Sequence, residues 1–238
     1  MKILIPTAKE LNTQVAQIEP ESLSEKTKLI IRALSQYSVA DLAQLYQIRP
    51  EKAKEEYQRI QKLQNETALT YPALYLFDGL MYRNIKRKDL SKEEEQYVQN
   101  HLLITSSLYG VIPALAPIAP HRLDFMTKLK VEKQSLKKLW TETYGQAVAD
   151  QEILLSLLSS EFEEVFPKEV RDKMIRFKFM EEKDGKRKIH STISKKARGQ
   201  FLTGLIEGQI QNIEDIKKLS FAGFAFQENL STDQELVF

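Results

Sequence analysis

The sequence predicts a single α/β domain in which helices flank a central mixed sheet, with a pair of helices inserted over residues 38–63. Short apolar runs rich in branched residues occur at Lys2–Ile5, Leu102–Thr105 and Ile153–Leu158, and such runs are typical of buried strands. Amphipathic stretches of helical period separate these runs. No repeat or low-complexity linker divides the 238 residues, so one domain spanning 1–238 is expected.

The composition is that of a globular protein with a hydrophobic core. Apolar residues make up 42% of the chain and charged residues 29%. No apolar run approaches the roughly 18 residues that cross a bilayer, and the N-terminus MKILIPTAKE lacks the long apolar stretch of a signal peptide. We therefore expect a cytoplasmic protein without a membrane partner, and a monomer is favoured.

The chain has no cysteine and only three histidines, which are widely spaced. Without cysteine there can be no disulfide, no thiolate metal site and no thiol nucleophile. The number and spacing of the histidines disfavour a histidine-based metal site. We expect neither a metal nor a cofactor.

Local signals predict three consecutive helices in the N-terminal part. A capping-box pattern that begins at Ser22 predicts a helix over 21–37. A second box at Ser38 predicts another helix, which Pro50 ends because the residue before a proline disfavours the helical conformation. Residues 51–63 form the third predicted helix, with its apolar positions at helical spacing.

The second and third of these helices have the outline of a helix-hairpin-helix element over 42–60. Such an element holds DNA without sequence preference, because its hairpin amides and the next helix N-terminus point at a phosphate. The usual hairpin glycines are Gln47 and Arg49 here, so a plain amphipathic hairpin is the alternative interpretation. The side chains of Arg49 and Lys52 are candidate phosphate contacts in either case.

Further elements follow from capping boxes, helical periodicity and alternation. Helices are predicted over 91–101, 135–149 and 192–208, and strands over 125–131, 221–226 and 235–238. A β-hairpin is predicted from Met174–Glu181 and Lys186–Ser191, with Asp184-Gly185 at the turn. Gly199 falls inside a predicted helix at a cost of roughly 1 kcal/mol against alanine, so a neighbouring element or a ligand is expected to approach its backbone closely.

Leu102–Phe125 is the stretch around which the chain is organised. Three of the eight prolines fall between 113 and 120, so neither a helix nor an interior strand can continue there. His121, Arg122 and Asp124 then follow almost side by side in the sequence. It is either one rigid wall of a functional site or a packed core loop in which Arg122 and Asp124 form an ordinary ion pair.

Charged residues are segregated along the chain although the formal net charge is only +2. Residues 83–88 and 183–198 are basic, and the second segment has seven Lys or Arg against one Asp. Lys9 follows the first strand, and Glu161 follows the strand at 153–158, where ligand-binding loops are common. These charges either face phosphate or belong to solvated surfaces.

Several motifs occur together in a fixed order. They are Ile5–Leu11, Phe77-Asp78-Gly79 with Tyr82, Leu108–Val111, Pro120–Asp124, Lys195–Gly199, Phe221–Phe226 and Glu235–Phe238. This ordered set, which extends over essentially the whole chain, resembles the YaaA family of peroxide stress proteins. Two positions depart from the family pattern: Pro6-Thr7-Ala8-Lys9 lacks the serine of Ser-Pro-Ala-Lys, and His121 replaces a common tyrosine.

The resemblance implies a single α/β domain of unusual topology with a helix-hairpin-helix element and a basic cleft that binds DNA. It also implies a role in limiting damage by hydrogen peroxide, associated with a low level of unincorporated intracellular iron. The first functional hypothesis is therefore a DNA-binding stress protein with a preference for structured or damaged DNA. Its candidate contacts are Lys9, Arg49, Lys52, Arg122, Lys195, Lys196 and Arg198.

Two other hypotheses remain open. One is a nucleic-acid-processing enzyme, of lyase or glycosylase type, whose catalytic candidates are Lys9, Asp124 and Glu161, since a cleft lysine can form a Schiff base and a carboxylate can act as a general base. The other is direct sequestration of iron, for which scattered carboxylates and few histidines are poor ligands.

Overall fold

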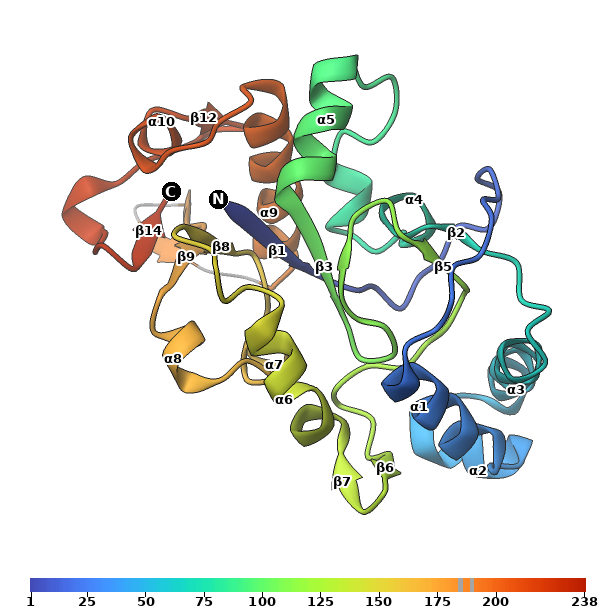
Figure 1. Cartoon of the computed structure of the whole chain (residues 1–238). Coiled ribbons are helices and arrows are strands. Elements are labelled where there is room, and N and C mark those ends of the chain that lie inside the picture. The colour runs from blue at the N-terminus through green and yellow to red at the C-terminus, as the bar shows by residue number, and fades with distance from the viewer. Residues whose placement is uncertain (184–185, 189–190) are drawn as a thin grey trace.

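A computed structural model describes residues 1–183, 186–188 and 191–238 (Figure 1). Its centre is a six-stranded sheet with the order β14-β9-β8-β1-β3-β4. Every neighbouring pair is parallel except β3 and β4, so the sheet is mixed, as predicted. The strands are β1 (Lys2–Pro6), β3 (Leu102–Ser106), β4 (Gly110–Pro113), β8 (Leu154–Ser156), β9 (Met174–Lys178) and β14 (Glu235–Val237).

The first strand occupies the middle of the sheet and is buried on both faces. Ile3 pairs with Leu102 of β3 on one side and with Leu155 of β8 on the other. Ile3 and Ile5 contribute to one hydrophobic core, whereas Leu4 contributes to the core on the opposite face. A continuous apolar run is what a strand covered on both faces requires, because successive side chains point to opposite sides.

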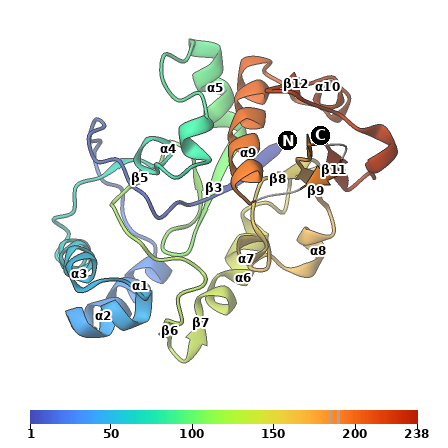
Figure 2. The ribbon, with the colours of Figure 1, turned by 180° about the vertical axis from the view of Figure 1, so that it is seen from behind.

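Helices cover both faces of the sheet (Figures 1 and 2). One core is formed with α4 (Ala73–Leu76), α5 (Lys92–His101), α9 (Ser191–Glu207) and α10 (Ile213–Lys217). The other is formed with α1 (Glu25–Ser35), α2 (Val39–Tyr46), α3 (Pro50–Gln64), α6 (Leu136–Gln146) and α7 (Ser160–Glu163). Trp140 of α6 anchors the second core, where its indole nitrogen donates to the carbonyl of Ser107 at 2.8 Å.

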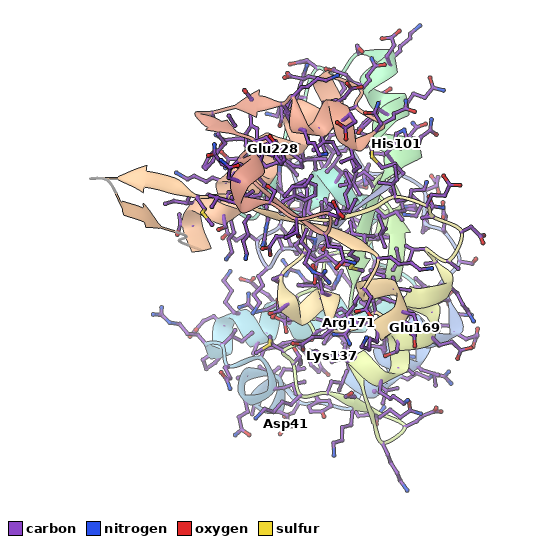
Figure 3. The ribbon with its side chains drawn as sticks, turned by 90° about the vertical axis from the view of Figure 1, so that its left-hand side faces the viewer. Asp41, His101, Lys137, Glu169, Arg171 and Glu228 are labelled. Atoms are coloured by element: carbon purple, nitrogen blue, oxygen red, sulfur yellow. The ribbon has the colours of Figure 1, made fainter. Side chains whose placement is uncertain are left out.

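Short elements complete the chain. They are β2 (Tyr71–Pro72), η1 (Tyr82–Asn84), β5 (Pro117–Ile118), β6 (Lys130–Val131), β7 (Gln134–Ser135), α8 (Lys168–Arg171), β10 (Glu181–Lys183), β11 (Lys186–Lys188), β12 (Ser220–Phe221), β13 (Phe224–Ala225) and η2 (Glu228–Leu230). The β10–β11 hairpin projects from the body of the molecule (Figure 3). In the same view Asp41 of α2 and Glu228 of η2 lie toward opposite ends of the molecule.

The capping boxes at Ser38 and Ser91 form as predicted and start α2 and α5. The predicted start of the first helix is wrong. Ser24 rather than Ser22 caps α1, because the Ser24 hydroxyl accepts the backbone N–H of Thr27 at 3.1 Å. The helix therefore begins at Glu25, four residues after the predicted start at residue 21.

Two strand predictions are also wrong. Residues 125–131 contain only the two strand residues of β6, because Asp124 accepts the backbone N–H groups of Met126 and Thr127 and closes a turn. The strand β9 does not pair with 186–191; it lies between β8 and β14 in the central sheet. The hairpin is instead made by β10 and β11, and the predicted turn residues Asp184 and Gly185 lie outside the described residues.

The glycine in the middle of α9 is explained by a neighbouring element and not by a ligand. A Cβ atom at Gly199 would overlap the carbonyl oxygen of Met81 and would lie 2.8 Å from the Cβ of Asn84. The same contact is continued by Thr203, whose hydroxyl accepts the backbone N–H of Lys86 at 2.8 Å. Helix α9 is thereby held against η1 and the residues that follow it over about one turn.

Replacing Gly199 by alanine is expected to destabilise the protein by about 2 kcal/mol, because overpacking against backbone outweighs the helix propensity that alanine gains. Urea denaturation followed by circular dichroism measures the change. The matched control is Lys196→Ala on the exposed side of the same helix, for which a change within about 0.5 kcal/mol is expected. A Gly199→Ala protein as stable as the wild type would contradict the tight contact between α9 and η1.

Candidate functional site

The order of the five parallel strands has a switch point between β1 and β8. Their order, β3-β1-β8-β9-β14, corresponds to the doubly wound order 2-1-3-4-5. From β1 the chain proceeds to β3 on one side, and the later strands are added on the other side. In open α/β sheets the crevice beyond the carboxyl ends of the strands at such a switch is the usual binding position.

Lys9 lies on the loop that follows the carboxyl end of β1, and the segment around Phe77-Asp78-Gly79 holds this loop in place. The Tyr82 hydroxyl donates to the carbonyl of Pro6 at 2.8 Å, and the backbone N–H of Asp78 donates to the carbonyl of Glu10 at 2.8 Å. A Cβ atom at Gly79 would lie 2.7 Å from the Cβ of Ala8. Two motifs that are distant in sequence therefore form one support for Lys9.

Asp124 is the ion-pair partner of Lys9. The Lys9 Nζ atom lies 2.6 Å from Asp124 Oδ2, and the Asp124 side chain is only 10% exposed. Asp124 Oδ1 accepts the backbone N–H groups of Met126 and Thr127, each at 3.0 Å, and the Thr127 hydroxyl at 2.9 Å. The carboxylate thus has four donors, and the cation paired with it comes from the β1 loop rather than from the adjacent Arg122.

A pocket of about 290 Å³ opens beside this ion pair. Its lining comes from three parts of the chain: the β1 loop, the last turn of α2 with its C-cap, and the segment that follows His121. The lining residues are Lys9, Gln44, Leu45, Tyr46, Gln47, Arg122, Asp124, Met126, Thr127 and Lys128. Three cations and one carboxylate therefore surround the pocket.

The phenol of Tyr46 stays protonated at neutral pH. Burial raises the pKa of Tyr46 far above its usual value, and the carboxylates of Glu56 and Asp124 raise it further. Burial also raises the pKa of Glu56, although the charges of Arg59 and Arg122 act in the opposite direction. Tyr46 is thus a hydrogen-bond donor on the α2 side of the pocket.

Glu161 belongs to the same group of charges. It lies in α7, immediately after the carboxyl end of β8. Burial raises the pKa of Glu161, the Asp124 carboxylate raises it further, and the charges of Lys9, Lys137 and Lys195 oppose this rise. Residues from the beginning, middle and end of the chain therefore act on one carboxyl group.

Helix α9 supplies three of the predicted cations in different surroundings. Lys195 and Lys196 are exposed. Arg198 is half-buried, burial lowers its pKa, and the charge of Glu163 partly offsets this effect. Glu163 also accepts the Arg176 Nε–H at 2.8 Å, so Arg198 lies near a second, less exposed ion pair.

The helical pair α2–α3 forms as predicted, and its connector is adjacent to the pocket. Gln47 ends α2 in the left-handed conformation with φ 53° and ψ 51°, a conformation that glycine adopts most easily. Arg49 precedes α3 and is exposed, and Lys52 is exposed and pairs with Glu55 at 3.0 Å. Arg49 and Lys52 are therefore near the pocket wall but do not line the pocket.

The structure brings together Lys9, Arg122, Asp124 and Glu161 and leaves His121 outside the site. His121 is 5% exposed and packs edge-on against Phe77 and Tyr109. Sequence reasoning missed Tyr46, Met126 and Thr127. Only Thr127 has a local signal, since a hydroxyl three residues after an aspartate is a common turn partner.

No group of three or more histidine, aspartate or glutamate side chains in the described part of the chain is arranged to hold a metal ion. Within the described ranges, no helix combines the length and apolar character that crossing a bilayer demands.

Comparison with known proteins tests the family resemblance directly. A family model described as Peroxide stress protein YaaA matches residues 1–230. A UPF0246 protein of Streptococcus gordonii is 92% identical over 238 residues, which are 100% of this chain and 98% of the relative. UPF0246 proteins of Streptococcus pneumoniae and Streptococcus sanguinis are 56% and 57% identical over the same shares of both chains. The chain therefore belongs to the YaaA family of peroxide stress proteins.

Proposed function

We propose that this protein is a cytoplasmic, monomeric DNA-binding protein of the peroxide stress response, which helps to limit oxidative damage and unincorporated intracellular iron. Its DNA interface is the crevice beyond the carboxyl ends of β1 and β8. The observation that supports the proposal most strongly is the meeting of Lys9 and Arg122 in one pocket, with Lys195 acting on the neighbouring Glu161. Cations gathered at a sheet edge provide the phosphate contacts that dominate DNA affinity.

The cations of the crevice differ in how they serve this interface. Lys9 keeps 57% of its side chain exposed while it contacts Asp124, so a phosphate can reach its ammonium group. Lys195 and Lys196 are exposed on α9, and Arg198 contributes its charge from a half-buried position. Structured or damaged DNA is favoured, because a crevice beside a pocket fits an irregular strand better than a straight duplex.

The α2–α3 hairpin is the second proposed contact region. Its exposed Arg49 and Lys52 lie at the beginning of α3, where a helix N-terminus favours a phosphate. The connector contributes no glycine, so the side chains of these two residues replace close backbone contact. Their phosphate contacts set the position of the DNA without reading its sequence.

A binding panel of duplex, single-stranded, bubble and abasic DNA at two salt concentrations tests the proposal. Affinity is expected to fall as the salt concentration rises. Each phosphate contact that a substitution removes reduces the slope of log affinity against log salt concentration by about 0.9 for duplex DNA. Lys195→Ala and Arg198→Ala are the test variants. Lys218→Ala is the control, because Lys218 is the C-cap of α10, is exposed and already pairs with Asp215. Affinity that does not change with salt would contradict electrostatic capture.

The second candidate function is a nucleic-acid-processing enzyme that uses Lys9. The contact between Lys9 and Asp124, together with the raised pKa of Glu161, favours it: two carboxyl groups in different environments can serve as base and acid. In a lyase reaction the Lys9 amine would add to the aldehyde carbon of an abasic deoxyribose, and water would leave as the imine forms. Borohydride would reduce that imine to a stable secondary amine, and Lys9→Ala would give no adduct.

Asp124→Asn separates the two functions. The substitution removes an anion from the proposed phosphate path but preserves a side-chain oxygen that accepts from Met126 and Thr127. DNA affinity is expected to rise about fivefold, which corresponds to about 1 kcal/mol from one relieved charge repulsion. Filter binding on abasic DNA measures the affinity.

The same variant in borohydride trapping measures the chemistry. A binding protein without chemistry gives no adduct in either form, whereas the lyase gives an adduct that falls in Asp124→Asn while affinity rises. Weaker DNA binding by Asp124→Asn, with an unchanged melting temperature, would contradict the placement of phosphate next to Lys9.

A further inference from the structure

The pocket beside Lys9 has one charged side. Lys9 of the β1 loop and Arg122 and Lys128 of the segment after His121 line it, and Asp124 is already occupied by four donors. The Asp124 carboxylate holds the Lys9 ammonium group at the pocket. The remaining N–H groups of Lys9 can donate to a second anion. One phosphate is the ligand group that such a side would take.

The rest of the pocket lining has a different chemistry. Tyr46 supplies an aromatic ring with a protonated hydroxyl, and Leu45 and Met126 supply apolar surface. Met126 is 65% exposed, an unusual position for a large apolar side chain and one at the rim of a pocket. Gln44 and Gln47 add amide groups, which are able to hydrogen-bond the edge of a nucleobase.

The volume of the pocket limits the size of the ligand that it can hold. The pocket measures about 290 Å³, close to the lower end of the range of about 300 to 1,000 Å³ that is typical of small-molecule sites. A base with one sugar and one phosphate fits such a space, whereas two stacked nucleotides do not.

We infer that this pocket holds one nucleotide unit, with its phosphate at Lys9 and Arg122 and its base against Tyr46 and Met126. The unit is either a free 5′-mononucleotide or a nucleotide turned out of a DNA strand. The inference rests on the proposed function, because the pocket shares Lys9 and Arg122 with the proposed DNA interface. It adds a site for a single base, which electrostatic capture of a strand does not require.

Isothermal titration of the full chain with the four deoxynucleoside 5′-monophosphates tests the inference, with inorganic phosphate and the corresponding nucleosides as separate probes. At least one nucleotide is expected to bind about tenfold more tightly than phosphate or its nucleoside, since base stacking and phosphate contact add. Tyr46→Leu and Met126→Ala are each expected to weaken nucleotide binding and to leave phosphate binding unchanged. Met126→Ala is informative even if Tyr46→Leu does not fold, because Met126 is exposed.

Competition with DNA identifies the source of the nucleotide. Displacement of bubble DNA by a mononucleotide, without displacement of duplex, indicates a unit turned out of a strand. Nucleotide binding that leaves all DNA bound indicates a free nucleotide. Phosphate that binds as tightly as every nucleotide, or DNA binding without any nucleotide binding, overturns the inference; the second result leaves the proposed DNA function intact.

Discussion

Lowering the pH from 7 to 4 is expected to destabilise the protein by about 3 kcal/mol through His121 alone. Burial lowers the pKa of His121 from 6.5 to about 4. Each pKa unit corresponds to about 1.4 kcal/mol, and the unfolded chain binds a proton at the higher pKa. The stabilisation is therefore complete above about pH 6.5 and is lost as the pH falls toward 4, with about 2 kcal/mol already lost at pH 5.

Burial is the main reason why the His121 ring is neutral; the charge of Arg59 lowers its pKa further, whereas the hydrogen bond to Ala119 raises it. Its Nδ1–H donates to the carbonyl of Ala119 at 3.0 Å. The Ser106 hydroxyl oxygen already accepts the backbone N–H groups of Leu108 and Tyr109, so its own hydrogen is directed to Nε2 of His121 at 3.4 Å. A second ring proton would face this hydroxyl hydrogen inside a core from which water is excluded.

Urea denaturation between pH 7 and pH 5 measures the effect before most carboxylates titrate. His121→Asn is the matched variant, because its amide can donate to Ala119 but cannot be protonated in this range. The variant is expected to be less stable at pH 7 and to have a flatter dependence of unfolding free energy on pH. An equally steep dependence in the variant would show that other groups titrate and would contradict the low pKa of His121.

Local chemistry explains which elements are predictable from the sequence. Ser38 and Ser91 each precede a carboxylate by three residues, and the reciprocal hydrogen bonds of both boxes depend on nothing outside that turn. Ser22 has the same spacing, yet Ser24 caps the helix; the buried Thr27, whose N–H donates to this cap, also donates its hydroxyl to the carbonyl of Leu108 in the core. Competing local signals of equal strength need tertiary packing to select one of them.

Long-range pairing explains the failures in the sheet. Alternation in Met174–Lys178 indicates a strand, but it does not reveal that the partners are β8 and β14, whose residues lie far away in sequence. The alternation at 125–131 arises because Phe125, Leu129 and Val131 are buried from an irregular segment. Alternate residues of an irregular segment can also be buried in the core, so alternating burial does not by itself indicate a strand.

Some residues of the candidate site can be predicted from the sequence, and others cannot. Lys9, Arg122 and Asp124 are recognisable by residue type beside proline breaks and strand ends, and the fold does bring them together. Tyr46 has no such signal, because it is one of several apolar positions on an amphipathic helix. It becomes part of the site only when α2 packs against the segment after His121, which no local pattern specifies.

Simultaneous replacement of Lys9 and Arg122 by alanine is expected to weaken DNA binding about 100-fold at low salt. Each side chain would lose one charge-assisted phosphate contact of about 1.5 kcal/mol, and about 1.4 kcal/mol corresponds to a factor of ten. The slope of affinity against salt for duplex DNA is expected to fall by about 1.8, since two phosphates are released. Fluorescence anisotropy with labelled bubble and duplex DNA at several salt concentrations measures both quantities.

The control removes the same number of charges from another part of the molecule. Lys217 and Lys218, at the end of α10, pair with Glu214 and Asp215, and α10 and α2 lie at opposite ends of the molecule in Figure 1. Their double alanine variant has the same net charge as the Lys9 and Arg122 variant, so diffuse attraction changes equally in the two proteins. An equal loss of affinity in both would mean that DNA responds only to total charge, and the crevice between β1 and β8 would then not be the interface. A large loss confined to the Lys9 and Arg122 variant, with unchanged thermal unfolding, would locate the phosphate contacts at the carboxyl end of β1, because these two cations line one pocket there.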